Sequence, residues 1–467
     1  MKILFVNWAP LWRGAQAGGG VNVYVQAMAS ALAQRGHQVS AVNAGYSYDA
    51  LLRPRLRRAR LFQGIKCYEI INSPIIAPGF FNAHKPLSDV QETRIEAVFQ
   101  RLLDRLQPDI VHFNNIEGFS GHCISLAKAA GARVIYSLHN YHPLCNQVNL
   151  LYQNRTPCTD FQQGQRCVDC LPAVPPRWRQ QLRRRIIYYI RNLPQAQRLR
   201  RIASPSTATL AAVATPVRAA VSAQDFHQRR TELVACLNQA DLLLAVSSWV
   251  RKVYVEYGLQ PDKVRVNAIG SAIAALGRAR PARPPKPAQS PLRLVFMGVA
   301  DIYKGLPLLL QALAQLEDAE LKQIDLALYA REIDRLEPAW RPLQTRLAAL
   351  HIQDGYRYTD IPELLADRDL GVVAPIWWDN APQVVFELLA LGVPVLGARI
   401  GGIPDFVSDG RNGLLFEPDN AADLAAKLRQ ALREPDFINR MRAGIQPMKT
   451  LTEHADELEV FYSGHCD

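Results

Sequence analysis

The sequence has no long apolar run. Nowhere among its 467 residues does an apolar segment approach the ~18 residues that a membrane-spanning helix needs, which argues against an integral membrane protein. The apolar run at residues 2–6 is too short for a signal peptide and ends at the polar Asn7. We therefore expect a first β-strand there and a cytoplasmic protein, with a peripheral position at the inner membrane face as an open alternative.

Cysteine and acidic residues are also scarce. Eight cysteines in a chain of this length, without a signal peptide, indicate free thiols and not a disulfide framework. The 42 acidic residues are outnumbered by 54 lysines and arginines, so the formal net charge is +12. This charge suits nucleic acid, an anionic lipid surface or a nucleotide-sugar phosphate. Nucleic acid is the least favoured of these partners, because the sequence has no zinc finger, helix-turn-helix or aromatic RNA-binding motif.

Short apolar runs alternate with amphipathic segments along the chain, which is typical of an α/β fold. The strand at residues 2–6, a glycine loop, a helix over 22–34 and a further strand form a βαβ pattern. Gly19 and Gly20 in that loop would let a phosphate approach the start of the helix, which favours an anion. The alternative is a flexible loop without a ligand.

A second helix is predicted within residues 375–402. A short strand precedes it, Asp379 and Asn380 offer side-chain caps, and Pro382 suits the first turn. Gly392 would end the helix.

Glu387 in this helix shares a face with apolar residues, where a carboxylate is costly unless it accepts hydrogen bonds. Sugar hydroxyls are suitable donors. Asp379 lies at the start of the helix, where the N–H groups of Gln383 and Val384 favour an anion. This helix could therefore bind a sugar, a phosphate and a ribose. The alternative is a capped helix with a glutamate at its rim.

The sequence here resembles a known family. The pattern is similar to the donor site of the retaining glycosyltransferase family four, which has the GT-B fold. It consists of Asp379, seven further residues and Glu387, followed by A-L-G-V-P-V and G-G-I-P-D-F-V-S-D-G-R-N-G-L-L-F. The resemblance implies that Asp379 contacts the transferred sugar and that Glu387 holds the ribose of a nucleotide diphosphate sugar. Asp379 replaces the usual Glu, and Pro382 stands where many members have Gly. Further residues implied to bind the donor are Asn380, Ala381, Gln383 and Val384.

A strand over residues 134–138 is followed by His139. Residues just beyond the carboxyl ends of parallel strands line the crevice of such sheets. A histidine there is either structural or catalytic on this evidence. The family carries a matching histidine near the reacting sugar, so the resemblance implies this role for His139, and it implies phosphate contacts for Gly19 and Gly20.

Residues from about 141 to 205 form an insertion rich in cysteine and arginine. Its cysteines are Cys145, Cys158, Cys167 and Cys170. They form either a tetrahedral zinc site or a set of buried thiols, and both alternatives stay open. Residues 177–201 contain nine arginines, no acid and an apolar, aromatic run. They are expected to form either an arm packed on its own domain or a surface that lies on an anionic membrane.

The second half opens after a segment rich in proline and basic residues at 276–291, which predicts an exposed, semi-rigid linker. The following stretch G-V-A-D-I-Y-K-G, residues 298–305, resembles the G-R-x-x-x-x-K-G loop of the family. Lys304 would then neutralise the diphosphate of the leaving group. Val299 stands where the arginine usually is, which removes one phosphate contact. Asp367-Arg368-Asp369 looks like a metal-binding D-x-D, but we assign it no metal because it matches a plain strand entry in the family.

Together these features predict two Rossmann-like, doubly wound α/β domains that face each other across a cleft, as in the GT-B fold. The expected parts are an acceptor-side domain at 1–275, the linker at 276–291, a nucleotide-sugar domain at 292–450 and a terminal helix at 451–467 that returns to the first domain.

The predicted activity is metal-independent, retaining transfer of a hexose from a UDP- or GDP-linked sugar to a sugar or lipid-linked hydroxyl acceptor. The expected setting is the synthesis of envelope polysaccharide, glycolipid or a related glycoconjugate, without any cofactor. The alternatives are a non-catalytic nucleotide-sugar-binding scaffold and a nucleotide-sugar epimerase of the same fold.

Overall fold

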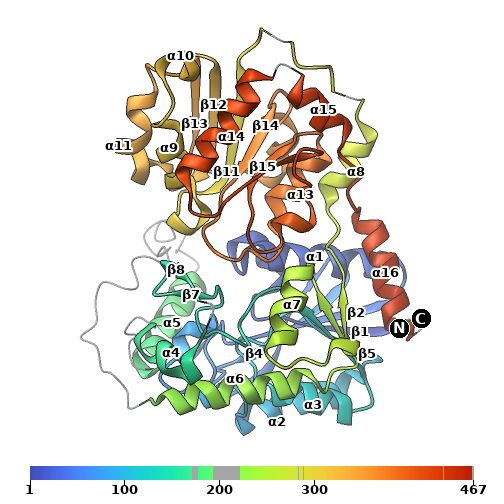
Figure 1. Cartoon of the computed structure of the whole chain (residues 1–467). Coiled ribbons are helices and arrows are strands. Elements are labelled where there is room, and N and C mark those ends of the chain that lie inside the picture. The colour runs from blue at the N-terminus through green and yellow to red at the C-terminus, as the bar shows by residue number, and fades with distance from the viewer. Residues whose placement is uncertain are drawn as a thin grey trace. The chain divides into compact units, whose positions relative to one another are not determined.

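The computed structural model describes residues 1–158, 160–170, 177–192, 221–281, 283–287, 289–434 and 436–464. The chain divides into two compact units, whose elements are labelled in Figure 1. The first unit contains Met1–Val246, Arg251–Asn267 and Ala455–Asp467, and the second contains Ser247–Val250 and Ala268–His454. No helix of the described residues is both long enough and apolar enough to cross a bilayer.

The first unit is built on an eight-stranded sheet with the order β10-β9-β6-β5-β1-β2-β4-β3. Neighbouring strands are parallel except for the edge pair β3 and β4. The inner strands are short and almost wholly buried, as expected when helices cover both faces of a parallel sheet. The strands are β1 (Lys2–Val6), β2 (Gln38–Ala44), β3 (Arg55–Phe62), β4 (Ile65–Ile71), β5 (Ile110–Phe113), β6 (Arg133–Leu138), β9 (Leu242–Ala245) and β10 (Val264–Val266).

The helices of the first unit connect these strands. They are α1 (Gly19–Gln34), α2 (Thr93–Leu106), α3 (His122–Ala129), α4 (Gln165–Cys170), α5 (Arg177–Asn192), α6 (Ala223–Leu237) and most of α7 (Ser248–Glu256) and α16 (Leu451–Ser463). The terminal helix α16 returns to this unit, as predicted. Its Tyr462 hydroxyl lies 2.7 Å from Nδ1 of the buried His112, and its Glu459 pairs with Arg35 and His37.

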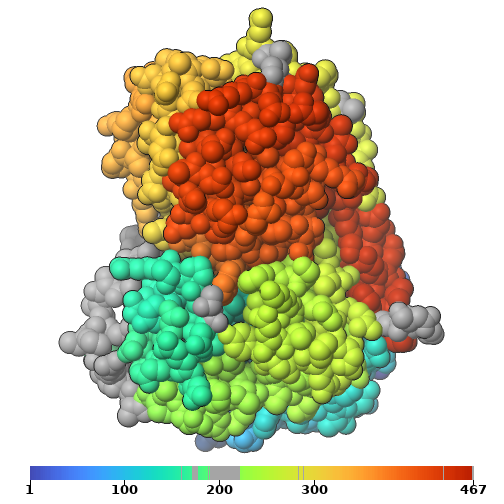
Figure 2. Space-filling view, in the orientation of Figure 1, coloured from blue at the N-terminus to red at the C-terminus, as the bar shows by residue number. Residues whose placement is uncertain are grey.

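The predicted insertion is described in part. Its described residues form a small hairpin of β7 (Leu151–Tyr152) and β8 (Thr156–Pro157), followed by α4 and α5. Figure 2 shows the residues around β7 and α4, in teal, at the surface of the first unit. The basic stretch predicted over residues 177–201 lies outside the described residues from position 193 onward.

The second unit contains a six-stranded, fully parallel sheet with the order β13-β12-β11-β14-β15-β16. Its strands are β11 (Leu292–Val299), β12 (Ile324–Arg331), β13 (Ala349–Gln353), β14 (Leu370–Val373), β15 (Val395–Ala398) and β16 (Gly413–Phe416). Its helices are α8 (Ala272–Ala279), α9 (Leu306–Leu313), α10 (Asp318–Leu321), α11 (Glu337–Trp340), α12 (Ile361–Leu364), α13 (Gln383–Ala390), α14 (Ala421–Arg433) and α15 (Phe437–Ala443). One continuous apolar core joins the sheet to these helices.

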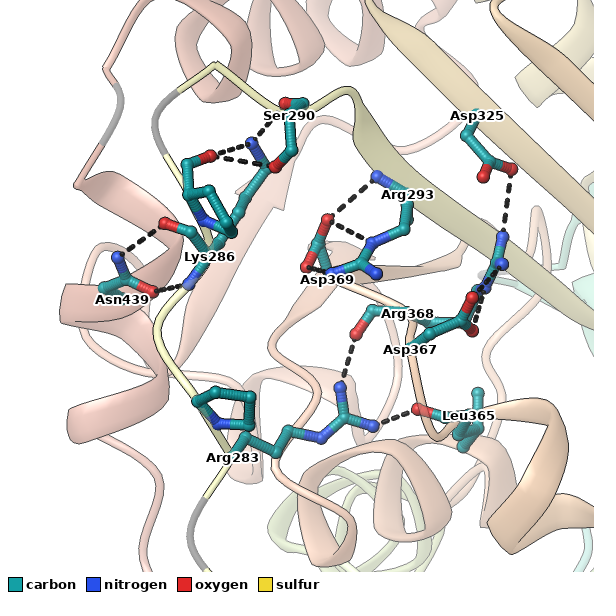
Figure 3. A network of polar contacts seen from close by, with 12 residues as sticks. Arg283, Lys286, Ser290, Arg293, Asp325, Leu365, Asp367, Arg368, Asp369 and Asn439 are labelled. Atoms are coloured by element: carbon teal, nitrogen blue, oxygen red, sulfur yellow. Dashed lines mark hydrogen bonds and ion pairs between the residues drawn. The ribbon is translucent and has the colours of Figure 1, made fainter.

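The second unit begins earlier than the expected boundary, because the proline-rich segment is fastened to it. Arg283 donates to the carbonyl groups of Leu365 and Arg368, the latter at 2.6 Å, and the backbone N–H of Lys286 donates to Asn439 at 2.8 Å (Figure 3). Arg283 also donates to the carbonyl group of Leu391 at 2.7 Å. The helix α8 also occupies part of the expected linker.

The D-x-D-like sequence is part of the same network. Asp369 is fully buried and pairs with Arg293 and Arg442, and Arg368 pairs with Asp325 and Asp367 (Figure 3 shows all but Arg442). Guanidinium groups therefore hold these carboxylates.

Candidate active site

Three of the predicted donor-site residues, Asp379, Asn380 and Ala381, lie on the loop between β14 and α13. Gly402, on a neighbouring loop, donates its backbone N–H to the carbonyl oxygen of Asp379 at 2.8 Å. A Cβ atom added at Gly402 would lie 2.0 Å from the carbonyl oxygen of Asn380. Only glycine allows this approach, and the contact fixes the backbone that carries Asp379.

Asp379 and Lys304, both predicted from the sequence, are in direct contact although 75 residues separate them. The Lys304 ammonium group donates to Oδ2 of Asp379 at 2.7 Å. It also lies 5.1 Å from the ring centroid of Trp377, within cation–π range. The Ile376 N–H bonds the Tyr303 carbonyl at 3.1 Å, which ties the two loops together. The second unit therefore places a cation and a carboxylate side by side at the ends of adjacent strands.

Glu387 lies on α13 with 5% of its surface exposed. Among the residues that the structure describes, none donates a hydrogen bond to its carboxylate. Burial raises the pKa of Glu387 to about 7. Burial also raises the pKa of the neighbouring Tyr356 and Tyr358, and the Glu387 charge adds to both effects. The carboxylate can therefore accept hydrogen bonds from ligand hydroxyls and is costly to ionise without them.

The predicted caps of this helix are wrong. Pro382 is itself the N-cap residue and makes no side-chain capping bond, and α13 runs over Gln383–Ala390. The Asp379 carboxylate bonds Lys304 instead of the helix start. Gln383 and Val384 are the first helical residues, where backbone amides and the helix dipole favour an anion.

The other predicted residues belong to the first unit. Gly19 and Gly20 are exposed in the first turn of α1. His139 follows β6, is half-buried, and lies with Nε2 3.2 Å from Oδ1 of Asn114. Its ring packs against Tyr24 of α1, with centroids 4.7 Å apart. His139 is thus oriented beside the same helix that begins with the two glycines.

The nearby His142 has different surroundings. It is 1% exposed, its carbonyl accepts from Arg229 at 3.0 Å, and Arg229 also pairs with Asp89 at 2.8 Å. Burial, with the charge of Arg229, holds the pKa of His142 well below its ordinary value. His142 is therefore a neutral part of a buried network, which favours His139 as the residue available to a ligand.

The cysteines of the insertion do not form a metal site in the part of the chain that the structure describes. No group of three or more His, Cys, Asp or Glu side chains there is placed to hold a metal ion. The Cys167 thiol accepts from Arg230 at 3.3 Å, and the Cys170 thiol lies 2.9 Å from the Gln147 amide. Cys145 and Cys158 are also free thiols, and both are buried. Cys167 and Cys170, by contrast, are half-buried thiols with polar neighbours.

Sequence reasoning missed Arg331. It ends β12, and its residue partner across the parallel ladder is Val299, the position where the family usually has arginine. Arg331 is exposed, and no carboxylate among the described residues pairs with it. Burial raises the pKa of Tyr303 to about 12, and the charge of Arg331 opposes that rise. The available signal was an arginine at the end of β12, but it could be related to Val299 only once β12 was known to lie beside β11.

Comparisons with known proteins identify related sequences. The family model described as Glycosyltransferase Family 4 matches residues 18–221, and that described as Glycosyl transferases group 1 matches residues 281–446. The putative colanic acid biosynthesis glycosyltransferase WcaL of Salmonella typhimurium is 24% identical over 207 residues, which are 42% of this chain and 48% of WcaL. The sulfoquinovosyl transferase SQD2 of Arabidopsis thaliana is 27% identical over 145 residues, which are 30% of this chain and 26% of SQD2. The matched region thus spans less than half of each curated relative.

Solved structures resemble the whole chain. Sucrose-phosphate synthase from Thermosynechococcus elongatus has a TM-score of 0.60 at 16% identity and covers 100% of this chain and 99% of its own. Anabaena HepE in complex with UDP and glucose has a TM-score of 0.55 at 16% identity and covers 99% of each chain. At such identities the likeness shows the fold alone. The two family models together match most of the sequence and the fold is the GT-B fold, so the chain belongs to glycosyltransferase family four.

Proposed function

We propose that this protein is a glycosyltransferase that moves a sugar from a nucleotide diphosphate sugar to a hydroxyl acceptor, with retention of configuration and without a metal ion. The observation that carries the proposal is the pairing of Lys304 with Asp379 before α13, together with a buried Glu387 on that helix that lacks a described hydrogen-bond donor. The complexes of Anabaena HepE with UDP and UDP-glucose support a nucleotide sugar as the donor class.

Glu387 accepts hydrogen bonds from the ribose hydroxyls of the donor. Those bonds favour the ionised carboxylate and offset the cost of burying its charge. Asp379 bonds hydroxyls of the transferred sugar, and Asn380 and Ala381 complete the turn around it. The Lys304 ammonium group is held by Asp379 before donor binding and then turns to the diphosphate, so neither charge is left unpaired at either stage.

The reaction breaks the bond between the anomeric carbon and the diphosphate oxygen and forms a bond from that carbon to the acceptor oxygen. The family resemblance implies attack from the face that the diphosphate leaves. The acceptor proton then passes to the departing phosphate oxygen. Lys304 and the helix start at Gln383 and Val384 stabilise the negative charge that develops there. For the first unit we keep the roles predicted from the sequence, which are phosphate contacts for Gly19 and Gly20 and orientation of the sugar for His139.

Arg331 supplies the positive charge that Val299 lacks. The two residues are register partners on adjacent strands that end beside the Lys304 loop, and no described carboxylate competes for the guanidinium. A planar guanidinium suits a phosphate group. In this protein the second phosphate-binding cation is thus supplied by β12 instead of β11.

The acceptor is the hydroxyl of a sugar or of a lipid-linked sugar. The relatives WcaL, named for colanic acid biosynthesis, and SQD2, a sulfoquinovosyl transferase, support polysaccharide or glycolipid synthesis as the setting. The proposed location is the cytoplasm, at the inner membrane face where a lipid-linked acceptor would be met.

Isothermal titration of the full chain with UDP- and GDP-sugars tests the donor site, and release of nucleotide from the bound sugar tests the reaction. We expect binding of one nucleotide class and slow release that an acceptor accelerates. Val299, Asp379 and Pro382, which depart from the family pattern, favour a second candidate, a non-catalytic sugar-nucleotide-binding protein. Tight binding without release under any acceptor would support that candidate, and absence of binding would contradict both.

A further inference from the structure

Helix α5 (Arg177–Asn192; Figure 1) carries an exposed apolar stripe. Its large apolar side chains are between 46% and 60% exposed, and they are Trp178, Leu182, Ile186 and Tyr189. Their spacing of four, four and three residues places them on one face of the helix. Monomeric proteins seldom expose a continuous row of this kind without a partner.

The opposite face of α5 is polar and is fastened to the first unit. Arg184 donates to the carbonyl oxygens of Gly45 at 2.8 Å and Ala77 at 2.6 Å, and its guanidinium lies 5.3 Å from the Phe81 ring centroid. Gln180 is buried on the same side. An ordinary surface helix buries its apolar face and exposes its polar one. The orientation of α5 is the reverse, and the Arg184 bonds fix it.

Positive charge surrounds the stripe. Arg179 and Arg183 are exposed beside it, and α5 has no acidic residue. None of the arginines from 177 to 185 pairs with a carboxylate in the described part of the chain. The Ala50 N–H bonds the Tyr189 hydroxyl at 3.1 Å, and the adjoining Leu51 and Leu52 are also exposed. The apolar surface therefore continues past the end of the helix.

We propose that this α5 surface, formed by Trp178, Leu182, Ile186 and Tyr189 with Arg179 and Arg183, docks on the interface of an anionic lipid bilayer. A row of apolar side chains that can enter the acyl boundary, flanked by uncompensated arginines that face headgroup phosphates, is the chemistry that such an interface binds. Nucleic acid would match the arginines but not the apolar row. Residues 193–220 contain four arginines and no acid, so they lack the charge to complement this surface. The inference is independent of the donor site.

Vesicle co-sedimentation of the full chain tests the inference. The probes are vesicles of phosphatidylcholine alone and vesicles with an equal part of phosphatidylglycerol, each at low and at physiological salt. We expect binding to the anionic vesicles that salt weakens. The double variant Trp178→Ser/Ile186→Ser should bind at least about tenfold more weakly, and Arg179→Ser/Arg183→Ser about twentyfold more weakly, on anionic vesicles.

Matched controls are Leu276→Ser/Val460→Ser and Arg335→Ser/Arg433→Ser, which remove exposed apolar and exposed basic side chains from other surfaces. They should sediment like the original chain, and every variant should keep its nucleotide binding and its melting temperature. Equal binding to both vesicle types, or equal losses in the controls, would overturn the proposal. So would a dimer in solution that Trp178→Ser/Ile186→Ser dissociates without any vesicle binding, because the surface would then join two copies of the chain.

Discussion

Replacing Glu387 by glutamine separates the stability of the donor site from its function. In the donor-free protein, burial moves the pKa of this carboxyl group from 4.5 to about 7, a difference that corresponds to at most about 3 kcal/mol. A carboxyl group whose pKa is higher in the folded state binds more protons there than in the unfolded state. The free energy of unfolding of the original chain should therefore fall as pH rises from about 4.5 through about 7.

Glu387→Gln keeps the shape of the side chain and cannot ionise. At pH about 8 the variant should therefore be more stable than the original chain, by up to about 3 kcal/mol less the cost of burying the amide. For a unit of this size that gain amounts to roughly 5–10 °C in melting temperature. At pH about 5 the two proteins should differ little.

Nucleotide binding should change in the opposite direction. The ribose hydroxyls donate to an ionised carboxylate, and such bonds contribute about 1.5–3 kcal/mol, so the variant should bind UDP or GDP about 10- to 100-fold more weakly at pH about 8. Below pH about 7, binding to the original chain must first remove a proton from Glu387, so its affinity should rise with pH more steeply than that of the variant.

Thermal unfolding and isothermal titration across this pH range measure both effects. The exposed Glu363, replaced by glutamine, is the matched control and should change neither quantity. A Glu387→Gln protein that is less stable than the original at high pH, and that binds nucleotide with unchanged affinity, would refute the assignment of this carboxylate to the ribose.

Three further predictions concern charges. Lys304→Gln should weaken UDP binding by at least about tenfold and leave UMP binding nearly unchanged, because the ammonium group is expected to contact the distal phosphate. Titration with both nucleotides measures the two affinities, and equal losses for UDP and UMP would contradict this contact. Arg331→Ser should weaken UDP binding about five- to tenfold, and the added change Val299→Arg should restore it; failure of that rescue would remove Arg331 from the phosphate site. Arg229→Leu leaves its partner Asp89 buried without a cation and should cost about 3–5 kcal/mol of stability, so an unchanged melting temperature would contradict the network around His142.

The local elements of the donor site could be predicted from the sequence. Pro382 in the first turn and Gly392 as the stop predicted a helix within one residue of α13 at each end. The capping bonds could not be predicted, because the competing partner Lys304 is distant in the sequence and reaches Asp379 only through the packing of two loops. The Asp379 carboxylate pairs with the Lys304 ammonium group at 2.7 Å because a charged donor binds it more strongly than the neutral amide donors of the helix start.

The order of the strands and the direction in which each helix face points could not be predicted from the sequence. Arg331 is informative only when β12 is known to lie beside β11, which places it opposite Val299. The composition of α5 allowed either a packed arm or a membrane surface, and the choice depends on which face the Arg184 bonds turn inward. Likewise, proline and arginine predicted an exposed linker, but the carbonyl groups near Arg283 accept its hydrogen bonds and draw the segment onto the second unit.

The contacts of Lys304, Asp379, Glu387 and Arg331 share one physical cause, which also explains how the proposed donor site stays folded without its ligand. The proposed ligand brings negative phosphates and hydroxyl donors, so each residue assigned to bind it needs another partner when the ligand is absent. Lys304 and Asp379 satisfy each other. Glu387 has no such partner among the described residues, and its raised pKa lets it hold a proton instead. Arg331 remains in water, where an unpaired guanidinium costs little. We expect donor binding to exchange the first two arrangements for contacts with the ligand, so that the affinity depends on pH through Glu387 and on phosphate number through Lys304 and Arg331.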